Sequence, residues 1–187
     1  MADAERLFRD CLGRFATGVT VVTTSHGDGV HGATVGSFVS VSLTPPLVMV
    51  SLDRRSRMCG LLLETPSFGV DILAEHQRGL ALHFAGRPLP ADVPLPWEPG
   101  APPRLAGCAA HLDCVPWAAY DGGDHVLHVA EVRAFSVGDA EPLVFHKGAF
   151  RALHRAPAHQ AWTGTLDGPA DGVWAQGLAS RYSPLGH

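Results

Sequence analysis

Lysine is nearly absent from this chain of 187 residues, and basic charge is not in excess. Lys147 is the only lysine, and 14 Lys and Arg against 18 Asp and Glu give a formal net charge of -4. Binding to nucleic acid needs clustered basic side chains that neutralise phosphate groups. The composition therefore argues against nucleic acid as a partner.

Long apolar runs and paired cysteines are missing as well. No run reaches the roughly 18 apolar residues that a bilayer-spanning helix requires, and the N-terminus, with Asp3, Glu5 and Arg6, lacks the apolar core of a signal peptide. The four cysteines, at positions 11, 59, 108 and 114, form no C-x-x-C pair and are too few for a secreted disulfide scaffold. We expect reduced thiols, a cytoplasmic protein and no membrane contact.

The eleven histidines do not fall at the spacings of a metal site. His125 and His128 lie three apart on an expected strand, so they point to opposite faces, and no H-E-x-x-H sequence occurs. A G-x-S-x-G nucleophile elbow and a P-loop are also absent, and no G-x-G-x-x-G leads from a strand into a helix as in a Rossmann fold. We expect no metal, and a bound nucleotide would require another architecture.

The elements that are present are mostly strands. Apolar periodicity predicts helices over 3–15, 53–63 and 75–84, the first with an apolar stripe at Leu7, Phe8, Cys11, Leu12 and Phe15. Runs rich in β-branched residues predict strands over 19–24, 34–43, 47–52, 68–73, 105–117, 126–137 and 142–146. Seven strands with short helices predict a mainly β protein, a closed or nearly closed barrel with helices over its ends.

Two segments do not fit regular structure. Residues 85–104 contain seven of the 15 prolines, which predicts an irregular connection of the kind that often forms a lid. Beyond about residue 155 the sequence is rich in Gly, Pro and Ala without periodicity. We expect one domain over 1–155 and a partly disordered arm over 156–187.

Hydroxyls and a glycine occupy the run from Thr34 to Leu43, where a buried strand would normally carry apolar side chains. Read as one strand, the run has Thr34, Gly36 and Ser40 on one face and Ser37 on the other, and neither face is cleanly apolar. A polar ligand against this run is one interpretation. Solvated Ser and Thr at the end of two barrel strands are the other.

Two further segments have functional and structural interpretations. Asp53–Arg57 follows an apolar strand and opens a helix, which favours an anion, and Arg87 would add positive charge; a solvated basic surface is the alternative. Asp121–His125 is a glycine-bearing turn that places an imidazole at a strand start. His125 would donate a hydrogen bond to a carbonyl or phosphate, or the segment is only a hairpin turn.

Several segments, in their order along the chain, resemble those of the short-chain flavin reductases. These enzymes are the reductase components of two-component flavin-dependent monooxygenases and have an FMN-binding split-barrel fold. The resemblance covers about residues 1–155. It rests on Phe15–Thr24, Ser37–Val48, Arg54–Arg57, Leu73–Gln77 with Phe84 and Ala85, Gly123–His125, and Pro142–His146 with Gly148.

The resemblance implies a role for each matched residue. The isoalloxazine ring and ribityl chain would contact Thr34, Val35, Ser37 and Ser40. The phosphate would be held by Ser56, Arg57 and Arg87 near Asp53 and Arg54, with Phe84 lining the pocket. His125, as the one catalytic residue, would face the nicotinamide, with His146 and Phe150 on the nicotinamide side.

The resemblance also implies the activity: an NAD(P)H-dependent flavin reductase, acting as a homodimer, that passes reduced FMN or FAD to a separate monooxygenase, with NADH or NADPH as hydride donor. Gly36 and Phe150 depart from the family, whose members often carry Asn or Ser, and Tyr, at these positions. These departures keep an alternative open: a split barrel that binds flavin or another small molecule without reductase turnover, or a natural-product tailoring enzyme that reuses the pocket.

Overall fold

The computed structural model describes residues 2–27 and 29–154. Its helices are α1 (Ala2–Leu12), α2 (Arg57–Glu64), the 3₁₀ turn η1 (Glu75–Gln77) and α3 (Arg78–Phe84). Its strands are β1 (Thr17–Gly18), β2 (Thr20–His26), β3 (Gly29–Val35), β4 (Val39–Leu43), β5 (Pro46–Asp53), β6 (Phe68–Ile72), β7 (Trp97–Glu98), β8 (Arg104–Leu105), β9 (Ala110–Gly122), β10 (His125–Val137), β11 (Val144–His146) and β12 (Ala149–Arg151).

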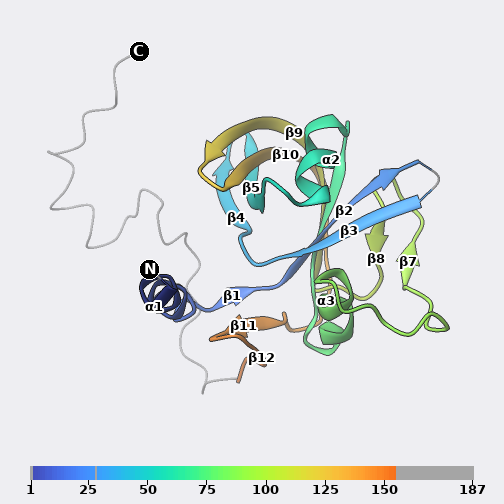
Figure 1. Ribbon diagram of the computed structural model, residues 1–187. Helices are drawn as coiled ribbons and strands as arrows, with labels where there is room; N and C mark the ends of the chain where they lie inside the picture. The colour runs from blue at the N-terminus through green and yellow to red at the C-terminus, as the bar shows by residue number, and fades with distance from the viewer. Residues whose placement is uncertain (1, 28, 155–187) are drawn as a thin grey trace, which may run out of the picture. The chain divides into compact units, whose positions relative to one another are not determined.

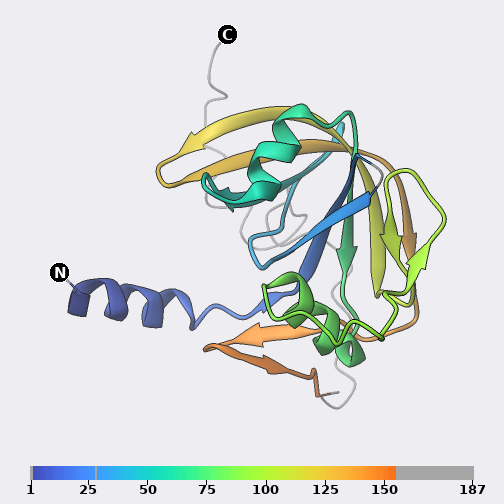
Figure 2. The ribbon, with the colours of Figure 1, turned by 45° about the vertical axis from the view of Figure 1, so that its right-hand side comes forward.

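A single antiparallel sheet of seven strands forms the body, in the order β3-β2-β6-β9-β10-β5-β4. Its two edge strands, β3 and β4, are joined by only the three residues 36–38, so the sheet must curl until its edges meet. α2 covers one end of the curled sheet and α3 the other (Figures 1 and 2). The predicted mainly β split barrel with short flanking helices is confirmed.

Two apolar clusters hold the barrel and its helices together. Phe68 and Val50 of the sheet and Met58 of α2 belong to the first and are almost fully buried. Leu73 and Leu80, beside and within α3, belong to the second. Burying one such side chain stabilises the fold by about 1.5–3 kcal/mol, which is why these short helices remain docked.

The apolar stripe of α1 is not buried by the described chain. The helix forms as predicted and ends at Leu12, but Leu7, Phe8, Leu12 and Phe15 are each more than half exposed. An amphipathic helix normally covers its apolar face. No helix of the described residues is long and apolar enough to cross a membrane.

The prediction of one continuous strand over 34–43 is wrong. The chain leaves the sheet after Val35 and re-enters it at Val39, and β4 carries a register shift between Ser40 and Ser42. Residues 36–38 instead cross from one edge of the barrel to the other. The alternating pattern therefore belongs to two strands that lie at opposite ends of the sheet order.

The structure differs from the prediction in other elements too. The strand predicted over 105–117 begins at Ala110, because Leu105 pairs with Trp97 in the small ribbon β7–β8. The proline-rich segment is therefore not wholly irregular. A short strand, β12, follows β11 and was not predicted. The expected arm over 156–187 lies outside the described residues.

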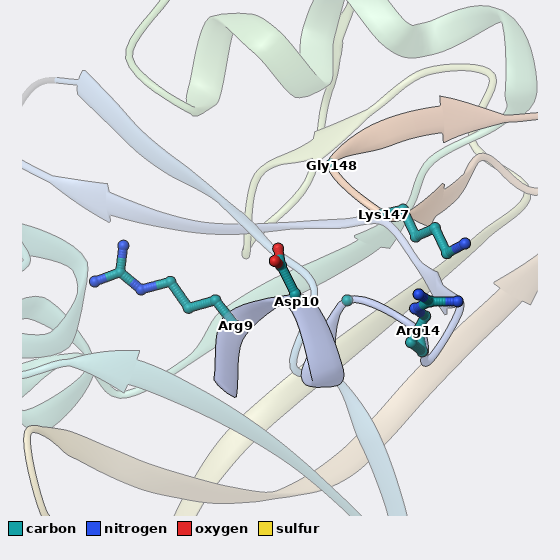
Figure 3. Close-up of a pocket in the computed structure, with 6 residues that line it drawn as sticks. Arg9, Asp10, Arg14, Lys147 and Gly148 are labelled. Carbon is teal, nitrogen blue, oxygen red and sulfur yellow. The ribbon is translucent and has the colours of Figure 1, made fainter. Parts of the chain in front are cut away.

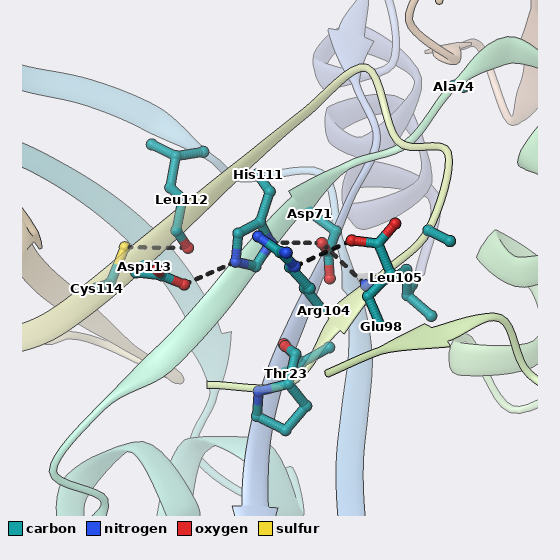
Figure 4. A network of polar contacts seen from close by, with 12 residues as sticks. Thr23, Asp71, Ala74, Glu98, Arg104, Leu105, His111, Leu112, Asp113 and Cys114 are labelled. Atoms are coloured by element: carbon teal, nitrogen blue, oxygen red, sulfur yellow. Dashed lines mark hydrogen bonds and ion pairs between the residues drawn. The ribbon is translucent and has the colours of Figure 1, made fainter. Parts of the chain in front are cut away.

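A buried polar network fixes the ribbon to the sheet (Figure 4). His111 lies between two carboxylates: its Nδ1 is 2.6 Å from Oδ1 of Asp71, and its Nε2 is 2.8 Å from Oδ1 of Asp113. The same Asp71 oxygen accepts the backbone N–H of Leu105 at 3.3 Å. Thr23 donates to the carbonyl of Pro103 at 2.5 Å. The proline-rich segment thus ends on buried polar contacts.

The charge of this network depends on pH. Burial alone would lower the pKa of His111, but the hydrogen bonds to Asp71 and Asp113 outweigh it and raise that pKa. Burial raises the pKa of Asp71, which is fully buried. When folding raises the pKa of a group, the stability that this group contributes to the fold is lost as the pH rises through its folded-state pKa. Both groups therefore favour the fold at lower pH.

Candidate functional site

The split between β3 and β4 opens into a pocket of about 390 Å³. Its walls come from the end of β3 with the crossing segment, the end of β5 with the loop before α2, and the start of β10. The lining residues are Ala33, Thr34, Val35, Gly36, Ser37, Ser51, Leu52, Asp53, Ser56 and His125. The pocket is thus made where three non-consecutive parts of the barrel meet.

Ser37 holds the crossing segment in place. Its hydroxyl donates to the carbonyl of Ser51 at 2.7 Å and accepts the N–H of the same residue at 3.0 Å. The pairing of β4 with β5 reaches only as far as Met49, so β4 does not extend to Ser51. The Ser37 side chain takes the place of that strand partner, and this keeps the pocket open.

The other polar residues of the run behave differently. Thr34 lines the pocket, but its hydroxyl donates to the carbonyl of Ala81 in α3 at 2.7 Å and so ties β3 to that helix. Val35 lines the pocket and is buried. Ser40 is exposed on β4 and does not line it. Three of the four residues expected at the ring are therefore brought together.

The loop after β5 positions Asp53 and Ser56. The hydroxyl of Ser56 caps α2 by accepting the N–H of Cys59 at 3.1 Å. The carboxylate of Asp53 binds the Arg55 guanidinium at 2.7 Å, and hydrogen bonds from Arg55 hold the pKa of Asp53 well below its usual value. Asp53 is therefore a carboxylate at neutral pH, and a phosphate would have to avoid it.

Arg54 serves the neighbouring turn rather than the pocket. Its guanidinium donates to the carbonyl of Gly123 at 2.6 Å and pairs with Asp121 at 2.8 Å, and its backbone N–H donates to the carbonyl of Asp124 at 3.0 Å. Gly123 has a φ of 79°, a conformation that favours glycine. Arg54 therefore fixes the β9–β10 turn from which His125 starts.

His125 stands on the wall opposite the crossing segment. It pairs with Asp53 across β5 and β10, and its Nδ1 is 2.7 Å from the carboxylate of Asp124. With a proton on Nδ1 donated to that carboxylate, Nε2 remains available to a ligand. His128 is buried on the other face of β10, as the spacing predicts.

Arg57, Phe84 and Arg87 do not line this pocket. Arg57 is exposed at the start of α2, and Arg87 is exposed just after α3. Neither guanidinium makes an ion pair or a hydrogen bond with the described residues. Their charge is therefore not neutralised within the described chain. Phe84 lies under β3 in a neighbouring pocket.

His146 and Phe150 lie in the small sheet β1-β11-β12, which both ribbon views place away from the β9–β10 turn (Figures 1 and 2). The Phe150 ring lies 5.6 Å below the Arg78 guanidinium and 5.3 Å from the ring of Phe145. The structure does not bring these two residues to His125 within the chain.

The pocket also contains residues that the sequence analysis missed as ligand contacts. Ala33, Ser51 and Leu52 lie on its wall because they neighbour the split, which the sequence pattern does not reveal. Gly36, a departure from the family pattern, lines the pocket as well. A Cβ at Gly36 would find only the Thr17 hydroxyl, at an ordinary 3.5 Å, so this position has room for a larger side chain.

A separate hollow of about 410 Å³ lies between the end of α1 and the β11–β12 turn (Figure 3). It is lined by Arg9, Asp10, Gly13, Arg14, Lys147 and Gly148. Figure 3 shows Arg14 and Lys147 on the same side of it. None of the residues expected to bind flavin or nicotinamide lies there.

Comparison with known proteins identifies the family. The model of the flavin reductase like domain matches residues 12–154. The chain belongs to this family. An NADH-dependent flavin reductase from a Rhodococcus species is 44% identical over 158 residues, which are 82% of this chain and 89% of that protein. The predicted family is thereby confirmed.

Two further relatives extend the comparison. The reductase subunit HsaB of a flavin-dependent monooxygenase from Mycobacterium tuberculosis is 32% identical over 87% of this chain and 90% of its own. The NADH:FAD oxidoreductase SgcE6 of Streptomyces globisporus, solved in complex with NAD and FAD fragments, superposes with a TM-score of 0.76 at 35% identity. That superposition covers 82% of this chain and 95% of the other. The relatives are oxidoreductases of the expected class.

Proposed function

We propose that this protein is an NADH-dependent flavin reductase that supplies reduced flavin to a separate monooxygenase. The observation that supports this most is the pocket at the split of the barrel, with the crossing segment on one wall, the start of α2 beside it and His125 on the facing wall. Its volume of about 390 Å³ lies within the usual range for cofactor sites.

The residues present fit a flavin. The crossing segment lies between strands, so its backbone is not part of a ladder and is available to the edge of a planar ring. The Gly36 position leaves open space at that edge. Ser37 and Thr34 already donate their hydroxyl protons to backbone carbonyls, so toward a ligand they act as hydrogen-bond acceptors. We assign the flavin ring to the wall that the crossing segment forms.

The phosphate has a natural place at the start of α2. Helix N-termini favour anions because their first N–H groups are not used within the helix. Ser56 caps α2, and Arg57, exposed and without an ion pair in the described chain, adds a full positive charge. Asp53 is already paired with Arg55, which reduces its repulsion of a phosphate.

A bound flavin supplies the redox chemistry by accepting a hydride from NADH. The protein's task is then to hold two flat rings face to face, a positioning role that needs no strong acid or base. His125 suits this role because Asp124 fixes its ring through Nδ1, leaving Nε2 to bind the nicotinamide carboxamide. We place His125 on the nicotinamide side of the pocket.

The same proposal includes a homodimer. The apolar stripe of α1 and Val39, Val41 and Leu43 of edge strand β4 are exposed, and exposed apolar patches mark interaction surfaces. A second copy would cover them and would complete the nicotinamide side with groups such as His146 and Phe150. A cytoplasmic location agrees with four cysteines that are all unpaired.

Oxidation of NADH by the purified protein tests the proposal, with FMN, FAD or no flavin added. Oxidation that requires flavin is the expected result, and NADH alone should give almost none. Flavin binding without oxidation of NADH or NADPH would instead favour the alternative of a binding protein without turnover. Sedimentation of the wild type and of Phe8→Glu tests the dimer, which the charged side chain should dissociate.

A further inference from the structure

A second pocket adjoins the first along β3. It has a volume of about 440 Å³ and is lined by Val30, His31, Gly32, His83, Phe84, Gly86, Leu95 and Trp97. The first pocket uses residues 33–37 of the same segment, and the second uses residues 30–32. We call the second one the Trp97 pocket.

The walls of the Trp97 pocket are aromatic. The rings of Phe84 and Trp97 meet edge to face, with centroids 5.9 Å apart. Gly32 is required above Phe84, because a Cβ at that position would lie 2.6 Å from two carbons of the ring. The pocket therefore presents flat apolar surfaces to whatever enters it.

Its polar groups suit a nucleobase. Nδ1 of His83 accepts the backbone N–H of Leu89 at 3.0 Å, so in the neutral ring Nε2 carries the proton and can donate. The ring of His31 makes no hydrogen bond with the described residues. Burial first, and then the charge of Arg57, lower the pKa of His31. A neutral His31 offers both a donor and an acceptor, as adenine requires of its partner.

Positive charge lies beside both pockets. Arg57 begins α2 next to Ser56, which lines the first pocket, and its charge helps to lower the pKa of His31 in the Trp97 pocket. Arg87 follows Gly86, which lines the Trp97 pocket. The first pocket and the Trp97 pocket thus follow one another along β3, beside guanidinium groups that have no ion pair among the described residues. Four strand residues cover about 13 Å, a span suited to a pyrophosphate linkage.

The Trp97 wall is held firmly although it belongs to the proline-rich segment. Trp97 pairs with Leu105 in the β7–β8 ribbon. The ion pair between Glu98 and Arg104 joins the two strands at 3.0 Å. Thr23 fixes Pro103 to the sheet. A ligand would therefore meet a preformed surface and would not need to order this segment.

We propose that the Trp97 pocket binds the adenine of FAD, so that this protein prefers FAD to FMN. The inference rests on the proposed function and extends it. FMN would fill the first pocket and reach Arg57, whereas FAD would continue into the Trp97 pocket. Stacking a base on an aromatic side chain strengthens binding by about 5- to 150-fold. The wild type should bind FAD more tightly than FMN by such a factor.

The test compares the wild type and four variants by calorimetric titration with FMN and with FAD. Trp97→Ala should lose the preference for FAD while its affinity for FMN stays within about 2-fold, and Trp97→Phe should retain most of it because an aromatic surface remains. Trp117→Ala removes an exposed tryptophan of β9 outside both pockets and should behave as wild type. His31→Leu is an independent change in the same pocket and should likewise weaken the binding of FAD but not that of FMN.

The outcomes separate this inference from the proposed function. Equal affinity of the wild type for FMN and FAD, with normal NADH oxidation, would overturn the inference and leave the reductase proposal intact. No turnover with either flavin would overturn the reductase proposal. NADH also carries adenine, so the KM for NADH is measured with FMN as the flavin. A KM raised by Trp97→Ala would place the adenine of NADH in the pocket and overturn the assignment to FAD.

Discussion

Replacing Ser37 by Ala should open the barrel at its split. The hydroxyl makes two hydrogen bonds, to the carbonyl and to the N–H of Ser51, at 2.7 and 3.0 Å. Each such bond contributes about 1 kcal/mol net, and a buried backbone group left without a partner costs about 1–3 kcal/mol. Because the site is only half-buried, water can replace part of the loss, so we expect a destabilisation of about 2 kcal/mol in total.

Chemical denaturation and thermal melting measure this change. For a chain of this size, about 2 kcal/mol corresponds to a fall in Tm of roughly 4–8 °C. Ser37→Thr keeps a hydroxyl and should recover part of the loss. Ser25→Ala, the same change at an exposed end of β2, is the matched control. If Ser37→Ala unfolds like the wild type, the side chain does not replace a strand partner and our account of the pocket is wrong.

Three further predictions follow from the site and the buried network. Arg57→Ala should weaken the binding of FMN by about 1.5–3 kcal/mol and that of riboflavin hardly at all, since only FMN carries a phosphate. Equal losses of affinity in titrations of the two ligands would mean that Arg57 is structural. His125→Ala should lower kcat/KM for NADH by about 10- to 100-fold with little change in flavin affinity; unchanged steady-state kinetics would remove His125 from the nicotinamide site. In wild type, the raised pKa of His111 should reduce stability as pH rises above its ordinary value of about 6.5, and His111→Gln should lose that contribution. Because the lowered pKa values of His31 and His128 act in the opposite direction, the test is the difference between the two melting curves across pH, and parallel curves would contradict the assignment.

Local sequence patterns were sufficient to predict most of the individual helices and strands. The run of β-branched residues after Val19 is β2, the Gly-Gly turn before His125 is the β9–β10 hairpin, and the segment from Glu75 to Phe84 is a short helix. These elements are set by residues near one another in sequence, through alternation, turn residues and helical spacing. Such signals remain visible without knowledge of the fold.

Tertiary contacts account for what the sequence did not reveal. The break at residues 36–38 depends on Ser37 reaching Ser51, and alternation on either side of it continues as if the strand were whole. The His111 network joins Asp71 to a strand 40 residues later, and no local pattern records such a contact. The ribbon at Trp97 forms in a segment whose prolines favour irregular structure.

The candidate site was predictable to a similar degree. Matching the family pattern selected Thr34, Ser37, Ser56 and His125, which the fold brings into one pocket. It also selected Arg54, whose guanidinium instead binds the neighbouring turn. A motif gives the position of a charged side chain along the chain, but its direction depends on partners that come from other strands.

Anaerobic mixing of the protein with oxidised flavin and NADH tests the central claim most directly. The absorbance bands of oxidised flavin and of NADH are followed together, so that one equivalent of each should disappear at the same rate. Our account predicts that this loss depends on the protein and is slowed in His125→Ala at subsaturating NADH. Flavin that remains oxidised in the presence of NADH or NADPH, although the protein binds it, would contradict the assignment of this pocket as a reductase site.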